Sequence, residues 1–442
     1  MTKNKFSLAV IVITIVTFVA ANVFAGSGPV FGTVTVAPAF ELDGRGKNVD
    51  SIAFWETPDP AETLIFVTAK NNNLLEVWKY PFLGNELLPI EFSSSVNGVT
   101  VDQEMDLLYV SESGARKVTV FSLPDLQLQG EFGQGDLGKG ETNLDILKHA
   151  NSQTLIYVTD DHTVHWFDAA SGIHLGKFSP PVSSIETVMA DDFYQVIMVP
   201  EEQGPKGNPG VYAFHPDGTP FEKNGTNHFG NNGEFDSDEE GILLYTLPTS
   251  GIGDDGTGFI VVSDQRKSQT DFEIFDRQTW EHLGTLRIDG VSNTDGIAST
   301  QKPLPDYPMG LFIAINDDKT VVGVGWDVIF EKTGLPSLGD NSTSTAPTQF
   351  RLRQNYPNPF NPTTTIQFAL AKHSSVKLNI YDLLGKEVAT LIDAELQPGE
   401  YDVTFDDEGI SSGVYFYRIH AKELSQSPGQ VFFETKKLLL LK

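Results

Sequence analysis

Residues 107–121 read LLYVSESGARKVTVF, and this stretch decides the fold. An apolar strand from Leu107 to Ser111 is followed by a polar turn and by a second strand, Val118 to Phe121, which ends in an aromatic residue. Short apolar runs separated by turn residues are typical of β-hairpins. The stretch therefore predicts two adjacent antiparallel strands.

The same pattern recurs between residues 26 and 335. The first strands of six copies begin at Leu64, Leu107, Leu155, Val196, Phe259 and Leu311, so that successive starts differ by 43, 48, 41, 63 and 52 residues. A repeat of roughly 40 to 50 residues with several strands is typical of a β-propeller, because one blade cannot bury both of its faces alone. Six copies predict six blades, and the long fourth interval is interpreted as a loop inserted at residues 224–240.

A second domain is expected after a polar linker. Residues 336–349 are rich in Ser and Thr and predict that linker. In the domain that follows, residues 350–442, strands are expected at Thr365–Leu370, Val376–Tyr381, Glu400–Phe405, Gly413–Ile419 and Val431–Leu441. Such strands can close a two-sheet sandwich. The predicted fold class is all-β: a six-bladed β-propeller in residues 26–335, followed by a small C-terminal β-sandwich.

The N-terminus predicts export. Lys3 and Lys5 precede an apolar run from Phe6 to Ala21, and small residues surround a cleavage position at Ala25. Residues 1–25 are therefore interpreted as a cleavable signal peptide. An uncleaved membrane anchor is the alternative, although the run is short for a membrane span. No later segment is long and apolar enough to cross a bilayer, so no transmembrane segment is expected in the mature chain.

The composition limits the partners and the chemistry. The sequence holds 30 Lys and Arg against 59 Asp and Glu, a formal net charge of −29. Such a surface repels nucleic-acid phosphates and anionic lipid, so neither is expected as a partner. The absence of cysteine excludes disulfides, thiol catalysis and iron–sulfur clusters. The acidity suits either plain solubility or the binding of divalent cations, of which calcium prefers carboxylate oxygens.

Two motifs look catalytic and are rejected. Residues 409–413 fit G-x-S-x-G, but a nucleophile elbow needs a helix after it, and here a strand is expected to follow. Residues 251–256 fit G-x-G-x-x-G, but a strand is expected there too, and two aspartates would face the pyrophosphate of a dinucleotide. Neither motif predicts an active site.

The C-terminal domain carries four ordered motifs. They are Gln354–Pro362 (QNYPNPFNP), Ile380–Val388 (IYDLLGKEV), Ser412–Tyr417 (SGVYFY) and the terminal residues 436–442. Together they resemble the sorting domains of type IX secretion substrates. The resemblance implies passage through an outer-membrane translocon, the secretion machinery as a partner, and a secreted or cell-surface location. An immunoglobulin-like accessory module is the alternative interpretation of such a sandwich.

Acidic motifs mark the ends of several repeats in the predicted propeller. They are Asp50–Trp55, Ile185–Asp192, Glu201-Glu202, Asp238–Gly241, Ser263–Gln265, Asp289–Gly296 and Asp306–Phe312. In this order they resemble the motifs of the β-propeller phytases. The resemblance implies a calcium-dependent hydrolase of phosphate monoesters such as phytate, with Ca²⁺ as its cofactor.

The resemblance also implies roles for individual residues. The implied calcium ligands are Asp50, Glu186, Glu202, Asp238, Glu240, Asp289 and Asp295, of which Asp50, Glu186, Asp238 and Glu240 form the catalytic group. Lys70 and Gln265 are the implied substrate-binding residues.

Several positions depart from the family pattern. Ser51 replaces an aspartate, Ala69 replaces one of two lysines, and Asp161 replaces a lysine, while an arginine is lost near Glu112 unless Arg116 substitutes for it. A phosphate cradle would thereby lose most of its cations. Two alternatives therefore stay open: a non-catalytic or differently specific surface propeller that binds calcium and another ligand, and a propeller lactonase or sugar hydrolase.

Overall fold

The computed structural model describes residues 30–149, 153–202, 209–223, 225–247, 254–337, 350–355, 358, 360, 363–383, 385–396, 399–406, 410–424 and 431–440. The chain forms two compact units, Gly26–Asp340 and a unit that includes Asn341–Lys442. We call them the larger unit and the C-terminal unit. The predicted signal peptide and most of the predicted linker, residues 338–349, lie outside the described residues.

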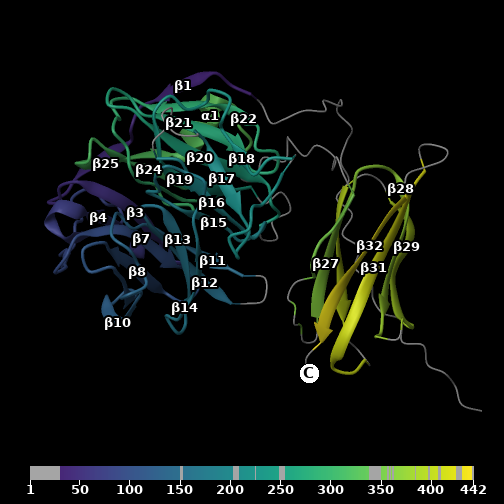
Figure 1. Ribbon diagram of the computed structural model, residues 1–442. Coiled ribbons are helices and arrows are strands. Elements are labelled where there is room, and N and C mark those ends of the chain that lie inside the picture. The colour runs from purple at the N-terminus through teal and green to yellow at the C-terminus, as the bar shows by residue number, and fades with distance from the viewer. Residues whose placement is uncertain are drawn as a thin grey trace, which may run out of the picture. The chain divides into compact units, whose positions relative to one another are not determined.

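Six sheets build the larger unit, one for each copy of the sequence repeat (Figure 1). In chain order their strands are β3 (Val49–Trp55), β4 (Leu64–Ala69), β5 (Leu74–Lys79) and β6 (Ile90–Glu91); β7 (Val96–Asp102), β8 (Leu107–Glu112), β9 (Lys117–Ser122) and β10 (Gln127–Phe132); β11 (Leu144–Lys148), β12 (Thr154–Asp160), β13 (Thr163–Asp168) and β14 (His174–Phe178); β15 (Met189–Asp191), β16 (Val196–Pro200), β17 (Val211–Phe214) and β18 (His228–Phe229); β19 (Asp238–Thr246), β20 (Gly258–Gln265), β21 (Asp271–Asp276) and β22 (His282–Ile288); and β23 (Ile297–Thr300), β24 (Leu311–Asn316) and β25 (Thr320–Gly325). The expected loop at residues 224–240 is wrong in part, because β18 and the beginning of β19 lie within it.

Two N-terminal strands complete sheets formed by the end of the unit. Strand β2 (Phe40–Asp43) is antiparallel to β25, with Phe40 opposite Gly323, and supplies the fourth strand of the last sheet. Strand β1 (Thr33–Val36) runs parallel to β22, with Thr33 opposite Thr285. The sequence repeat gave no sign of either pairing, since both join segments that are far apart in the chain.

Neighbouring sheets share apolar cores, and these cores close a ring. Phe66 of β4 and Val110 of β8 belong to one core, and Ile65 of β4 shares another with Ile313 of β24. Six such cores connect each sheet to the next and the last sheet to the first. The helix α1 (Trp326–Thr333), the α-helix of the described residues, adds Trp326 to one core. The larger unit is therefore all-β and propeller-like.

Buried hydroxyls join the sheets near their inner edges. The Oγ atom of Ser111 on β8 donates to the Thr142 carbonyl oxygen at 2.7 Å, in the segment that leads to the next sheet. Thr68 on β4 makes the equivalent bond to the Asn97 carbonyl oxygen. Both hydroxyl-bearing side chains are fully buried, so these bonds satisfy backbone carbonyls that water cannot reach.

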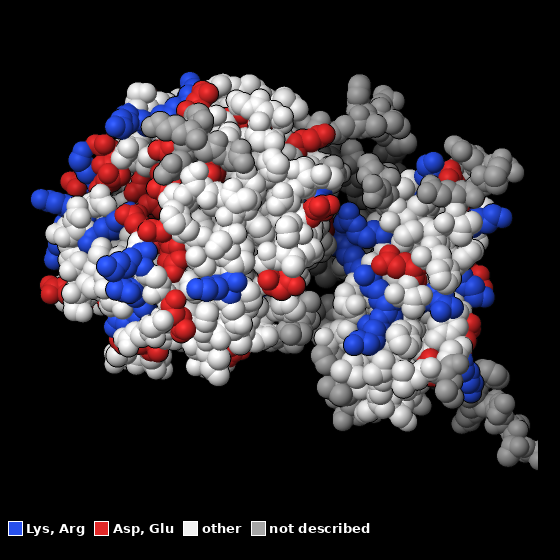
Figure 2. Space-filling view, viewed as in Figure 1, with Lys and Arg blue, Asp and Glu red and all other residues white. Residues whose placement is uncertain are grey.

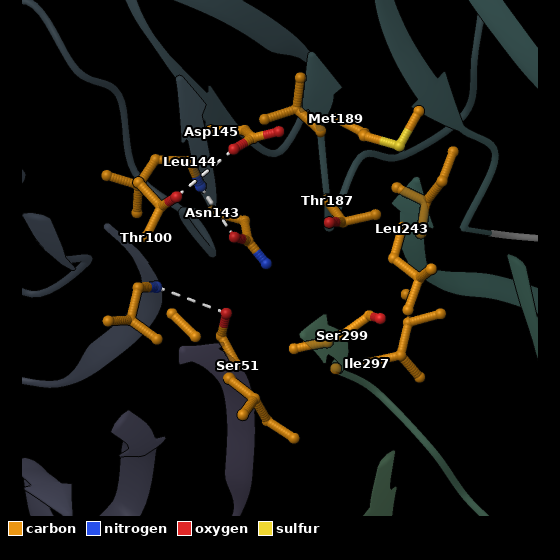
Figure 3. A pocket seen from close by; sticks show the side chains of 18 of the residues that line it. Ser51, Thr100, Asn143, Leu144, Asp145, Thr187, Met189, Leu243, Ile297 and Ser299 are labelled. Carbon is orange, nitrogen blue, oxygen red and sulfur yellow. Dashed lines mark hydrogen bonds between the residues drawn. The ribbon is translucent and has the colours of Figure 1, made fainter. Parts of the chain in front are cut away.

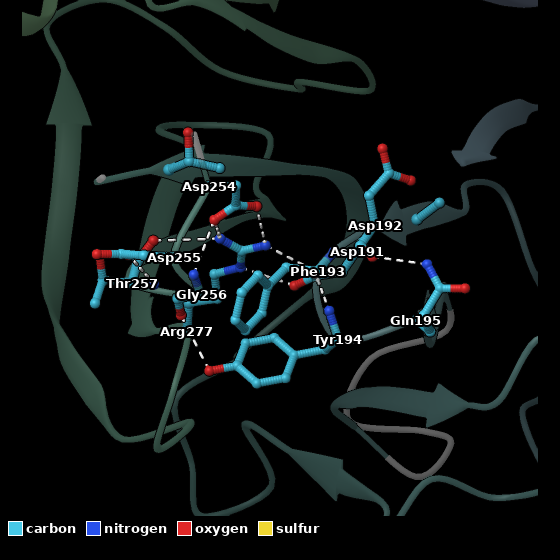
Figure 4. Close-up of polar contacts among 12 residues, drawn as sticks. Asp191, Asp192, Phe193, Tyr194, Gln195, Asp254, Asp255, Gly256, Thr257 and Arg277 are labelled. Carbon is cyan, nitrogen blue, oxygen red and sulfur yellow. Dashed lines mark hydrogen bonds and ion pairs between the residues drawn. The ribbon is translucent and has the colours of Figure 1, made fainter. Parts of the chain in front are cut away.

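Ion pairs of one arginine, Arg277, join two further sheets at the ends of β15 and β21 (Figure 4). Arg277 is fully buried and donates from Nε and Nη2 to the carboxylate of Asp191, at 2.8 and 2.7 Å. Its Nη1 and Nη2 also donate to Asp254, at 2.6 and 2.7 Å. Two bidentate pairs on one guanidinium fix this end of the ring, because the planar group matches both carboxylates.

The C-terminal unit is a sandwich of two sheets. One has the order β26-β27-β30 and the other β29-β28-β31-β32, with strands β26 (Arg351–Leu352), β27 (Thr363–Leu370), β28 (Ser374–Tyr381), β29 (Glu387–Leu396), β30 (Gly399–Asp406), β31 (Gly413–Glu423) and β32 (Val431–Leu440). Phe368, Leu378 and Tyr417 belong to the core between them. Strand β29 was missed by the sequence analysis. Among the described residues, no helix has the length and apolar character of a membrane span.

Candidate functional site

A cavity of about 360 Å³ lies where the first strands of the six sheets face one another. Its wall includes Asp50–Phe54, Val99–Val101, Asn143–Asp145, Glu186–Ala190, Glu240–Leu244 and Asp295–Ser299. Figure 3 shows Ser51, Thr100, Asn143, Leu243 and Ile297 arranged around the open space. Asp50, Glu186, Glu240 and Asp295 lie at or just before the beginning of a first strand, so they gather at one end of the cavity.

The ammonium group of Lys70 lies among three carboxylates at this end. Lys70 follows β4, and its Nζ atom is 2.6 Å from Asp50 Oδ1 and 3.2 Å from Glu186 Oε1. It also pairs with Glu141, which comes from the segment before β11. Oxygens of these three carboxylates lie within 4.8 Å of one another, a spacing that could hold a metal ion. The three carboxylates are therefore spaced so that they could hold a metal ion, and the Lys70 ammonium group lies among them.

Glu240 and Asp295 extend the acidic group on the other side of Lys70. Glu240 is buried, and its Oε2 atom has no hydrogen-bond partner in the described part of the chain. Burial raises its pKa to about 8, although Lys70 acts in the opposite direction. Burial also raises the pKa of Asp295 to about 9, with the nearby Asp50 carboxylate adding to the effect. Gln265 Nε2 donates to Asp295 Oδ1 at 2.5 Å and so orients that carboxyl group.

Asp50 and Lys70 depend on each other electrostatically. Burial raises the pKa of Asp50 to about 6, and Lys70 limits the increase. Burial on its own would lower the pKa of Lys70, but Asp50 and Glu141 outweigh it, so the pKa lies above its usual value. The lysine thus stays charged, and the carboxylates around it are held in a region where solvent stabilises charge poorly.

Three further expected ligands lie outside the group around Lys70. Glu202 and Asp238 are two acidic residues near this group, and we call them the acidic rim. Burial raises the pKa of Glu202, and the charges of Glu141 and Asp238 raise it further. Asp238 begins β19 opposite Gln265. Asp289 is exposed directly after β22, the strand that pairs with the edge strand β1. The geometry brings Asp50, Glu186, Glu240 and Asp295 together, places Glu202 and Asp238 nearby, and leaves Asp289 outside.

Cations near the site are already paired. Arg266 contacts Asp264 at 2.5 Å and Asp271 at 3.2 Å, and Arg287 pairs with Asp271 as well. The arginines thereby pair with two members of a second carboxylate group, Asp264 and Asp271, and the third member, Glu273, contacts His282 Nε2 at 2.6 Å. Arg116, which could have replaced a missing family arginine, is exposed in the turn between β8 and β9. The loss of cations expected from the sequence is consistent with this arrangement.

Three functional residues were missed in the sequence. Glu141 lies in a Gly-rich segment without a recognisable motif, and the asparagine Asn97 hydrogen-bonds Asp50 from β7. Asp318, in the turn between β24 and β25, accepts a hydrogen bond from Asn293 at 2.8 Å, and its charge raises the pKa values of Glu240 and Asp295. Only the closing of the ring brings these positions together.

A family model matches part of the larger unit. The Phytase family model matches residues 169–332, which include Glu186, Glu240 and Asp295. The larger unit is phytase-like. Asp50 and Lys70 lie outside the residues that the family model matches. The fold of the phytase-like unit brings them to the site. In Figure 2, Asp and Glu side chains gather in a band on this unit, in the region where Figure 1 labels β3.

A second family model identifies the tail. The secretion system C-terminal sorting domain matches residues 354–430, so the chain is exported by type IX secretion to the cell surface or the medium. Both resemblances drawn from the sequence are confirmed. No curated protein sequence matches the chain. Among solved structures, hydrazine synthase of Kuenenia stuttgartiensis is similar over 62% of this chain and 75% of its own, at 12% identity and a TM-score of 0.43.

Glu239 is expected to make the stability of the phytase-like unit depend on pH. Burial raises its pKa from 4.5 to about 9, helped by Asp264 and Glu201, while Gly210 N–H donates to its Oε1 at 3.0 Å. Folded protein then keeps a proton that unfolded protein releases, so the free energy of unfolding falls as pH rises from about 4.5 to about 9. We expect Glu239→Gln to flatten this slope in chelator-treated protein, measured by urea unfolding at pH 5 and 8. An unchanged slope would contradict the assignment.

Proposed function

We propose that the larger unit is a six-bladed β-propeller that hydrolyses phosphate monoesters such as phytate with the help of Ca²⁺. The observation that carries the proposal is the convergence of Asp50, Glu186, Glu240 and Asp295 with Lys70 at one end of the central cavity. We further propose residues 1–25 as a signal peptide, 26–335 as the propeller, 336–349 as a linker and 350–442 as the sorting sandwich.

The donor set fits calcium. Every carboxylate around Lys70 offers hard oxygen atoms, and the absence of cysteine leaves no thiolate to favour a softer ion. Among the described residues Glu240 Oε2 is buried without a hydrogen-bond partner, so this oxygen would gain from a nearby cation. Asp50, Glu141, Glu186, Glu240 and Asp295 would hold the ion, and Glu202 and Asp238 on the rim would add to a second position. Asp289 is not needed for this set.

The chain's own residues have distinct tasks in the reaction. Calcium, when bound, supplies the positive charge that lets an acidic site accept a phosphate. Lys70 Nζ can donate to a phosphate oxygen once it leaves Glu186, and Gln265 keeps the Asp295 carboxyl group oriented. Glu240, which lines the cavity, would accept the proton of the attacking water as a carboxylate. The leaving alcohol takes a proton from solvent or from the protonated carboxyl group.

One observation favours a second candidate function. The ammonium of Lys70 occupies the centre of the carboxylates, and the arginines nearby are paired with Asp264 and Asp271. A ligand with many phosphates would find few free cations here, so a surface propeller with another, less charged ligand is the alternative. This alternative retains the calcium site and abandons phosphate release.

Phosphate release by the mature protein tests the proposal. The full chain is incubated with phytate and, separately, with a simple aryl phosphate, at several calcium concentrations. We expect phosphate release that depends on calcium and stops when a chelator is added. Stabilisation by calcium without release from either substrate supports the non-catalytic alternative. A melting temperature that is indifferent to both calcium and chelator would remove both interpretations.

A further inference from the structure

Strand β32 is an edge strand of the sorting domain. It is the last strand in the sheet order β29-β28-β31-β32 and pairs with β31 along its full length (Figure 1). Backbone groups on its other side therefore need another partner or solvent. Natural proteins usually cover or interrupt such an edge, because a free strand edge pairs readily with a further strand.

Residues of the first motif of the C-terminal domain (QNYPNPFNP, from Gln354) cover the C-terminal half of this edge. The Leu439 N–H donates to Asn358 Oδ1 at 2.8 Å, and the Leu439 carbonyl accepts from the Phe360 N–H at 2.9 Å. Gln354 Nε2 donates to the Lys437 carbonyl at 2.7 Å. Asn358 and Gln354 thus replace the backbone of a missing strand. This is a physical role for two residues of the motif that identifies the tail.

In the part of the chain that the structure describes, no segment pairs with the other half of the edge. Backbone groups of an antiparallel strand point to alternate sides with a period of two residues. Since Leu439 and Lys437 point outward, Thr435, Phe433 and Val431 do so as well. None of these three has a backbone partner on the outer side among the described residues. Phe433 is 59% exposed and Val431 is 52% exposed, so the open edge is also apolar.

Basic groups accompany the open edge. On β31, Arg418 lies opposite Thr435, His420 opposite Phe433, and Lys422 opposite Val431. All three β31 side chains are exposed. The Arg418 guanidinium lies 5.1 Å from the centre of the Phe433 ring and 4.9 Å from that of Tyr381. In Figure 2, Lys and Arg side chains are spread over the C-terminal unit.

On the exposed face of this sheet the acidic side chains lie on β29, whereas Glu434 of β32 lies opposite the buried Ile419 and contacts Lys436 at 3.2 Å. The β29 residues Asp393 and Glu395 pair in register with Lys377 and Ser375 of β28, on the opposite edge of the same sheet. The β32 side is thus positive and the β29 side negative. Charge complementarity therefore favours a partner with carboxylates at the β32 edge.

We propose that the open half of β32, Val431 to Thr435, is the docking site for an extended, carboxylate-bearing segment of the secretion machinery. The segment adds a strand to the sheet, with its backbone bonded to the outward groups of Val431, Phe433 and Thr435. Its apolar residues cover Phe433 and Val431, and its carboxylates face Arg418 and Lys422. Main-chain bonds provide affinity in such strand addition, and side chains provide selectivity.

A peptide titration with the full chain tests the docking site. The probe is a fluorescently labelled (Val-Glu)₄ peptide, and (Val-Lys)₄ is the charge-reversed control. We expect (Val-Glu)₄ to bind at least about ten-fold more tightly, because like charges would face each other in the control complex. Thr435→Pro should weaken binding at least about ten-fold, since proline removes an outward N–H. Thr435→Val keeps that N–H and should bind as the parent does.

A second variant and an export assay complete the test. Val431→Pro places proline at the first residue of β32, where a strand tolerates it, and protects the test against a folding defect of Thr435→Pro. In a bacterium with a type IX system, we expect both proline variants to stay in the periplasm while Thr435→Val is exported. Equal peptide binding by the proline and valine variants would overturn the proposal, as would normal export of both proline variants.

Discussion

Replacing Arg277 by methionine is expected to destabilise the larger unit by about 3–5 kcal/mol, because it leaves the buried carboxylate of Asp191 without its partner. Asp191 is fully buried, and its remaining bonds come from the backbone N–H groups of Phe193 and Tyr194 at 3.0 Å. Methionine fills much of the space of the arginine stem, so the loss reports the charge rather than a cavity. Urea unfolding followed by tryptophan fluorescence measures it.

The fluorescence signal reports the larger unit alone. All five tryptophans lie there: Trp55, Trp78, Trp166, Trp280 and Trp326. The matched control is the double variant Arg277→Met with Asp191→Asn, in which no unpaired charge is buried at position 191. We expect the double variant to recover part of the lost stability. A loss below about 1 kcal/mol for Arg277→Met would show that the pair is not needed to hold this end of the ring.

Replacing Glu240 by glutamine is expected to lower calcium-dependent phosphate release by about a hundred-fold or more, since the carboxylate is proposed both to hold the ion and to accept a proton. Glutamine has the same shape and carries no charge. Without calcium, the variant should be at least as stable as the parent above pH 8, where the parent must bury the ionised carboxylate. Phosphate release and melting with and without chelator measure the two effects.

Asp289→Asn is the matched control for this experiment. It removes one carboxylate of another motif of the family, Asp289–Gly296, from an exposed position directly after β22. We expect its phosphate release and its response to calcium to match those of the parent within about two-fold, because exposed charges at a distance are screened by salt. A strong loss in Asp289→Asn would return this residue to the ligand set and contradict the geometry described above.

The sequence predicted what repeats locally. The apolar runs at Leu64, Leu107 and Val196 begin β4, β8 and β16 at those residues, because each run is bounded by turn residues that end a strand. In the C-terminal unit, Val431 begins β32 as expected. Strand β29 was missed because acidic residues such as Glu387 and Asp393 interrupt it and no regular apolar alternation marks it.

For the site, contacts between residues far apart in the chain could not be predicted from the sequence. Asp50 and Glu240 were found because they stand in motifs, but Glu141 has no motif and meets Lys70 only across 71 residues of chain. Lys70 itself was expected to bind substrate, and its contacts with three carboxylates depend on how the sheets close. The periodicity of a sequence predicts where strands lie. It does not predict which loops come into contact when the sheets close into a ring.

Because β2 pairs with β25, the last sheet can be completed only after nearly the whole unit has been synthesised. Phe40 and Gly323 are partners, so β2, one of the first two strands to be synthesised, must wait for nearly the whole unit before its own partner exists. Contacts between such distant residues make folding slow, which favours a chain that is still open when it crosses the inner membrane. Processing of the N-terminus also has a limit: a cut beyond residue 39 would remove the strand that seals the ring.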